Sequence, residues 1–106
     1  MPSLRTKLTQ IPKIVKERVS ERDKGCCVLC GRWVGIEYAN AHIVPRSRGG
    51  LGIERNIITL CQSCHYAFDQ TPNRPKHYQT IEAYIKRHYP DWKREDNIFK
   101  KGHHEC

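Results

Sequence analysis

Two Cys-x-x-Cys pairs constrain the fold of this chain more than any other feature. Cys27 pairs with Cys30 and Cys61 with Cys64, and thirty residues lie between Cys30 and Cys61. Two thiolates three positions apart on a tight turn bind one metal ion from the same side, and a second pair completes a tetrahedron. The spacing therefore predicts a structural zinc site with four cysteine ligands and no open coordination position. The alternative is a set of unrelated buried or disulfide-bonded cysteines.

The length and the number of cysteines agree with a small metal-stabilised domain. The chain has 106 residues, six cysteines and 38% hydrophobic residues, which allows one domain with a small core. Bound zinc would contribute on the order of 10 kcal/mol to folding such a core. The first 24 residues carry seven Lys or Arg and no apolar stretch, so no secretory signal is expected. We therefore expect the chain to fold in a reducing cytoplasm. Cys26 is expected to pack in the fold, and Cys106 has no evident partner.

Charge is concentrated at the two ends of the sequence. The formal net charge is +8, with +4 in residues 1–24, +1 in residues 25–70 and +3 in residues 71–106. Basic flanks around a nearly neutral centre favour a polyanionic partner such as nucleic acid, although many soluble proteins carry a similar charge. The longest apolar run, residues 26–30, is too short to cross a membrane, so no membrane association is expected.

Hydrophobic spacing and turn residues predict a small α+β domain flanked by helices. The order is a helix, a β-hairpin and two further helices. We expect a flexible basic arm over 1–10, a domain over 11–92 with its motif core at 27–70, and a charged tail over 93–106. Within the domain, the predicted elements are a helix starting at 11 and stopped at 23–25, an extended hairpin region over 33–44, a loop over 45–52, a strand over 56–60, and helices over 61–70 and 77–88.

The candidate catalytic residues lie between the cysteine pairs and directly after the second pair. His42 stands on the predicted hairpin, beside a glycine-rich loop that carries Arg46 and Arg48. Such a loop lets guanidinium groups approach a phosphate, so both arginines are candidates for DNA contacts, or simply solvated charges. Asn56 and His65 follow. A neutral imidazole, an orienting amide and a metal-binding imidazole are the parts that a one-metal phosphodiesterase needs.

The joint pattern resembles the HNH endonuclease family, in its small zinc-containing phage or prophage type with the ββα-metal fold. The residues that carry the resemblance are Cys27-x-x-Cys30, then Ala41-His42-Ile43-Val44-Pro45-x-Ser47-x-Gly49-Gly50, then Asn56-x-x-x-Leu60-Cys61-x-x-Cys64-His65.

This resemblance implies a role for each of three residues. His42 would be the general base that activates water, Asn56 would orient the hairpin and the base, and His65 would coordinate the catalytic divalent ion. The implied cofactors are structural Zn²⁺ and catalytic Mg²⁺ or Mn²⁺, with other divalent transition metals as alternatives. The implied function is hydrolysis of DNA phosphodiester bonds in a bacterial host cytoplasm, by nicking or by double-strand cleavage. The implied partners are DNA and, as a further prospect, phage packaging (terminase) proteins, with the chain a monomer or a homodimer.

One position departs from the family pattern. Ala41 stands where many members have an acidic or histidine metal ligand, and it has no donor atom. Asp69 follows His65 by four residues, so on a helix both side chains project from one face, and we expect them to hold the ion together. The alternative for Asp69 is a solvated charge near the helix end. The missing ligand also keeps open a different function, a non-catalytic zinc-containing module that binds nucleic acid.

Overall fold

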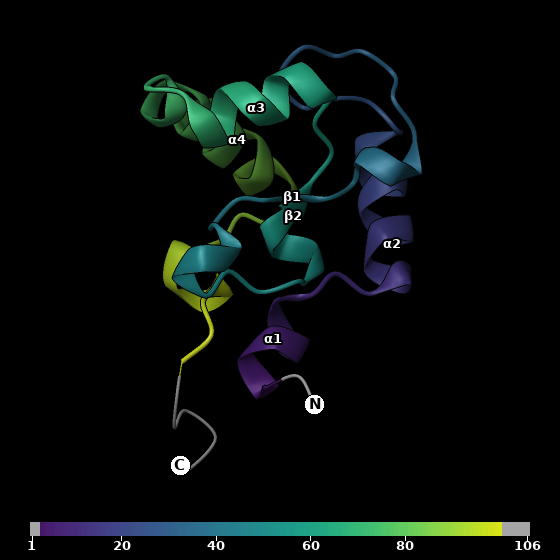
Figure 1. The fold of residues 1–106 in the computed structure, drawn as a ribbon. Coiled ribbons are helices and arrows are strands. Elements are labelled where there is room, and N and C mark those ends of the chain that lie inside the picture. Colours follow the sequence, from purple (N-terminus) through teal and green to yellow (C-terminus); the bar gives the residue numbers. More distant parts are fainter. Residues whose placement is uncertain (1–2, 101–106) are drawn as a thin grey trace.

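The computed structural model describes residues 3–100 and has the small α+β fold that the sequence predicts (Figure 1). A short hairpin lies at the centre; two helices precede it in the sequence and two follow it. The regular elements are α1 (Leu4–Thr9), α2 (Lys13–Asp23), β1 (Ala41–His42), β2 (Ile57–Ile58), α3 (Gln62–Gln70) and α4 (Arg74–His88). Within 3–100, no helix is long and apolar enough to cross a membrane.

The hairpin is much shorter than the extended region predicted over 33–44. The strands β1 and β2 are antiparallel, with Ala41 opposite Ile58 and His42 opposite Ile57. Residues Ile36–Tyr38 form a 3-10 turn instead of a strand. Gly35 makes this possible, because its φ of 92° starts a turn that residues with a side chain rarely adopt. The prediction of a long strand was wrong because β-forming residues of this segment lie in a turn.

The helices begin and end close to the predicted positions. Lys24 takes a left-handed φ of 57° and ends α2, as the sequence around it predicted. Cys61 caps α3, since its Sγ accepts a hydrogen bond from the backbone N–H of Cys64. Helix α4 begins at Arg74, three residues earlier than predicted, because Pro75 in its first turn has a φ that already suits a helix.

Residues 3–10 of the predicted arm and residues 93–100 of the predicted tail contact the loop over 45–52. Residues Leu4–Thr9 form α1, and the carbonyl of Leu8 accepts a hydrogen bond from the N–H of Gly52 at 2.9 Å. A Cβ on Gly52 would stand 1.7 Å from the carbonyl oxygen of Gln10, so this close approach requires glycine. In the predicted tail, the N–H of Phe99 donates to the carbonyl of Gly49 at 2.7 Å. Both segments thus pack on the loop over 45–52, while Cys106 lies outside the described residues.

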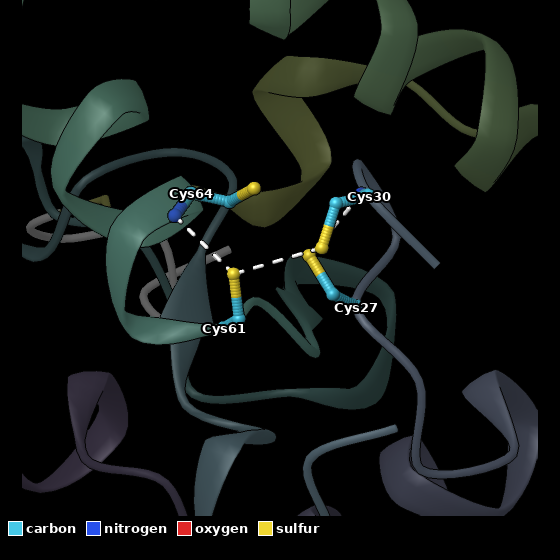
Figure 2. A group of neighbouring side chains, drawn as sticks. All are labelled: Cys27, Cys30, Cys61 and Cys64. Carbon is cyan, nitrogen blue, oxygen red and sulfur yellow. Dashed lines mark hydrogen bonds between the residues drawn. The ribbon is translucent and has the colours of Figure 1, made fainter. Parts of the chain in front are cut away.

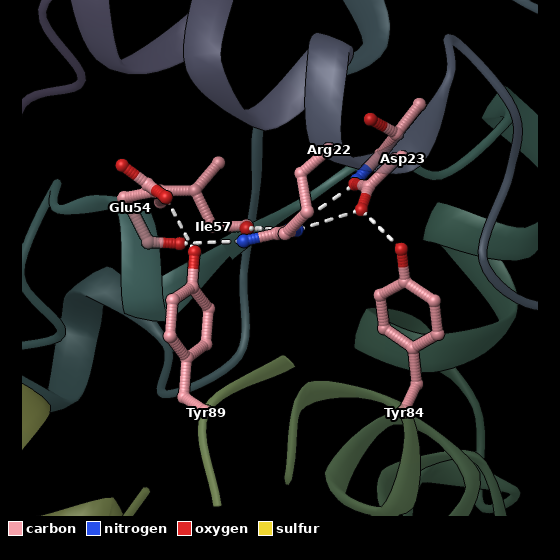
Figure 3. A network of polar contacts seen from close by, with 7 residues as sticks. Arg22, Asp23, Glu54, Ile57, Tyr84 and Tyr89 are labelled. Atoms are coloured by element: carbon pink, nitrogen blue, oxygen red, sulfur yellow. Dashed lines mark hydrogen bonds and ion pairs between the residues drawn. The ribbon is translucent and has the colours of Figure 1, made fainter. Parts of the chain in front are cut away.

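A buried polar network joins α2, β2 and α4 (Figure 3). Arg22 and Asp23 form an ion pair of 2.8 Å, with side chains 7% and 0% exposed. The Asp23 carboxylate also accepts hydrogen bonds from the backbone N–H of Thr59 and the hydroxyl of Tyr84. Arg22 donates to the carbonyl of Ile57 at 2.8 Å. Loss of one partner would leave a buried charge unpaired, so this network fixes the helices against the hairpin.

Candidate functional site

The four cysteines of the two pairs converge on one point (Figure 2). Their sulfur atoms all lie within 4.8 Å of one another, and those of Cys30 and Cys61 are 3.7 Å apart. A tetrahedral zinc ion with Zn–S bonds of about 2.3 Å requires sulfur atoms about 3.8 Å apart. The donor set and its dimensions therefore fit a structural zinc ion held by Cys27, Cys30, Cys61 and Cys64.

Backbone N–H groups prepare this cage for thiolates. The N–H of Cys30 donates to the Sγ of Cys27, and that of Cys64 donates to the Sγ of Cys61, each at 3.4 Å. Burial tends to raise the pKa of Cys61, but the hydrogen bonds from the Cys64 N–H and from the side chains of Ser63, Cys64 and Cys30 lower that pKa to about 6. Burial and the neighbouring thiols raise the pKa of Cys64. Cys26 is outside the cage, and its Sγ donates to the carbonyl of Lys24 at 3.4 Å.

The imidazole of His42 is oriented by the end of helix α1. Its Nε2 lies 2.8 Å from the carbonyl oxygen of Thr9, which can only accept a hydrogen bond. Nε2 therefore carries the proton, and in the neutral ring Nδ1 is an acceptor. Burial lowers the pKa of His42, and the charge of Arg46 adds to this effect, while the Thr9 carbonyl opposes it. The result is a neutral imidazole with a basic nitrogen at Nδ1.

Asn56 is fully buried and contacts the backbone of the loop that follows His42. Its Oδ1 accepts from the N–H of Val44 at 2.9 Å, and its Nδ2 donates to the carbonyls of Leu51 at 2.8 Å and Val44 at 3.3 Å. Its own carbonyl accepts from the N–H of Ile43 at 2.8 Å. Asn56 thus acts on His42 through the backbone and not by direct contact.

His65 and Asp69 lie one turn apart on α3, as their spacing predicted. The Nε2 of His65 and the Oδ2 of Asp69 are 2.9 Å apart, and both side chains are about one-third exposed. Ala41 faces the other way, because it is 1% exposed and belongs to the hydrophobic core that also contains Phe68. The pair on α3 thus presents one imidazole nitrogen and one carboxylate oxygen that could hold a second ion.

The two arginines of the loop lie in different surroundings. Arg46 packs on α1, where its Nε donates to the Oγ1 of Thr9 at 3.1 Å and its Nη2 to the carbonyl of Thr6 at 3.4 Å. Arg48 makes no such contact to α1 among the described residues. Arg46 thus holds the helix, and both Arg46 and Arg48 line the cavity described next.

A cavity of about 540 Å³ brings the candidate residues together. Its lining includes His42, Arg48, His65, Asp69, Arg74 and Arg94. Sequence reasoning missed Arg74 and Arg94, because each lies on an element after the motif and no local pattern distinguishes either from a solvated arginine. Only the packing of α4 and of residues 94–97 against the loop reveals them.

The cysteine cage thus lies beside a hairpin and a helix that present two histidines to one cavity. The family model described as HNH endonuclease matches residues 27–67, which confirms the resemblance read from the sequence. This match includes both cysteine pairs, His42, Asn56 and His65.

One curated protein is also similar to the chain. It is "Anaredoxin" of Nostoc sp. (strain PCC 7120 / SAG 25.82 / UTEX 2576), which is 35% identical over 51 residues. The match covers 47% of this chain and 64% of that protein, so the chain spans less than two thirds of its relative. No solved structure matches the chain significantly.

Proposed function

We propose that this protein is a metal-dependent endonuclease that hydrolyses DNA phosphodiester bonds. One observation carries the proposal: the neutral imidazole of His42 and the His65–Asp69 pair line the same cavity. A base and a metal-binding pair facing one space are what hydrolysis of a phosphodiester requires. Arginines on the same lining supply the positive charge that a phosphate backbone needs.

Each residue then has a role that follows from its contacts. His42 accepts a proton from the attacking water at Nδ1, since Nε2 is bound to the Thr9 carbonyl. Asn56 fixes the loop and the strand from which His42 projects. Arg48 binds the DNA backbone.

His65 and Asp69 would hold the catalytic ion, and their donor set suits it. One imidazole nitrogen and one carboxylate oxygen, both partly exposed, leave positions open for a phosphate oxygen and water. Mn²⁺ accepts both ligand types, and Mg²⁺ prefers the carboxylate. When bound, the ion supplies Lewis-acid stabilisation of the phosphate and the leaving oxygen. Zn²⁺ in the cysteine cage has no open position, so its contribution is structural.

The wider setting remains a prediction from the resemblance. DNA is the proposed partner, and phage or prophage origin, association with packaging proteins and a bacterial host cytoplasm extend that proposal.

Cleavage of supercoiled plasmid tests the proposed activity. Zinc-loaded protein is incubated with plasmid and Mg²⁺ or Mn²⁺, beside the variants His42→Ala and His77→Ala. His77 lies on α4 and does not line the cavity, so it serves as the matched control. We expect cleavage by the wild type and by His77→Ala, and none by His42→Ala. DNA retained in a gel shift but never cleaved with any divalent ion would instead support the non-catalytic nucleic-acid-binding module.

A further inference from the structure

Arg74, the first residue of α4, is held in place beside the proposed metal ligands. Its Nη2 donates to the carbonyl of Ile43 at 3.1 Å, and its guanidinium lies 4.1 Å from the centre of the Phe68 ring. Its Nη1 is 3.5 Å from the Oδ1 of Asp69, whose Oδ2 is 2.9 Å from His65. The Asp69 carboxylate is therefore shared between an imidazole and a guanidinium.

The charge around this carboxylate is strongly unbalanced. Among the described residues, four arginines but one carboxylate line the cavity. Arg48 and Arg94 line the same cavity as Arg74. A divalent cation that enters alone meets this excess of positive charge, and Arg74 competes with it for Asp69.

We propose that Arg74 makes metal binding at His65 and Asp69 depend on a phosphodiester. This inference rests on the proposed nuclease function and deepens it. A phosphate in the cavity gives Arg74 a bidentate anionic partner, which frees the Asp69 carboxylate for the ion. The phosphate also neutralises part of the positive charge that opposes the ion. By linkage, the ion strengthens phosphate binding by the same factor.

Titration of Mn²⁺ followed by electron paramagnetic resonance tests the coupling directly. Full-length, zinc-loaded protein in a His42→Ala background is titrated with and without a short DNA duplex, and the duplex alone serves as the blank. We expect the duplex to tighten Mn²⁺ binding by about tenfold, within the usual range of coupling between sites. Arg74→Gln should bind Mn²⁺ more tightly without DNA, and the factor by which the duplex tightens Mn²⁺ binding should fall well below that of the background protein.

The control is Arg87→Gln, which removes the same charge from an exposed position on the same helix. It should behave as the background protein does. Arg74→Lys keeps the charge and loses the fork, so it should keep part of the coupling; it carries the test if Arg74→Gln loses its zinc or its helical circular dichroism.

Two results would have different meanings. Mn²⁺ binding that is equal with and without the duplex, or that Arg74→Gln and Arg87→Gln change alike, would overturn the role of Arg74 and leave the proposed nuclease intact. If the background protein binds no Mn²⁺ even with the duplex, and Asp69→Ala gives the same result, the metal site of the proposed function itself is overturned.

Discussion

Replacement of Asn56 by alanine should lower the stability of the fold and also disable the site. The side chain is 0% exposed and makes three hydrogen bonds to the backbone of Val44 and Leu51. At about 1 kcal/mol for each bond, Asn56→Ala should lower the free energy of unfolding by about 3 kcal/mol. For a domain of this size, that corresponds to a fall in Tm of roughly 12 to 24 °C.

Thr59→Val is the matched control, because Thr59 is equally buried and stands three residues away. Its hydroxyl oxygen has no hydrogen-bond partner among the described residues, so an isosteric apolar side chain should leave stability unchanged or raise it slightly. Urea unfolding of zinc-saturated protein, followed by circular dichroism, measures both variants.

The functional arm of this prediction uses the same two proteins. Below its unfolding transition, Asn56→Ala should cleave plasmid much more slowly, since the strand that carries His42 loses its anchor. Thr59→Val should cleave at the rate of the wild type. A loss of less than about 1 kcal/mol in Asn56→Ala, or equal effects of the two substitutions, would refute the reasoning.

Three further predictions concern the zinc, the base and the first helix. Cys61→Ser should lose zinc and unfold, while Cys26→Ser should keep one zinc per chain, by metal analysis and circular dichroism. Because burial lowers the pKa of His42 from 6.5 and only the neutral ring accepts a proton, cleavage should persist below pH 6.5 and fall as the pH drops through that lowered value; a pH–rate profile that already declines at pH 7 would contradict this. Deletion of residues 1–10 removes the Thr9 carbonyl and should slow single-turnover cleavage by about tenfold or more while changing DNA affinity less; a loss confined to affinity would contradict this and favour DNA binding by the basic segment.

Local patterns were enough to predict the cage and the helices around it. The spacing of the cysteines within each pair is set by a single turn, and Cys61 both belongs to the cage and caps α3, so sequence and structure agree there. The facing of His65 and Asp69 follows from helix geometry alone. These features depend on residues at most a few positions apart, which is why a single sequence contains them.

Contacts between distant segments account for what the sequence did not show. Helix α1 is short and polar, and only its packing on the loop over 45–52 explains why Arg46, which lines the cavity, also binds that helix. Arg74 reaches the cavity because α4 folds back across α3. This brings it to the carbonyl of Ile43, which lies 31 residues earlier in the sequence. The hairpin was overestimated because β propensity depends on packing, and residues 36–38 pack as a turn.

The carboxylate of Asp23 sets a limit on transplanting this domain. The segment matched by the family model begins at residue 27, yet the N–H of Thr59 inside that segment is bound by a carboxylate four residues upstream of its start. That carboxylate is in turn bound by Tyr84, seventeen residues beyond its end. An excised fragment of residues 27–67 would expose a buried amide and lose both flanking helices. A graft into a designed nuclease or a fusion protein therefore has to carry α2 and α4 with it. The two junctions with the recipient protein then belong at α1 and after residue 100.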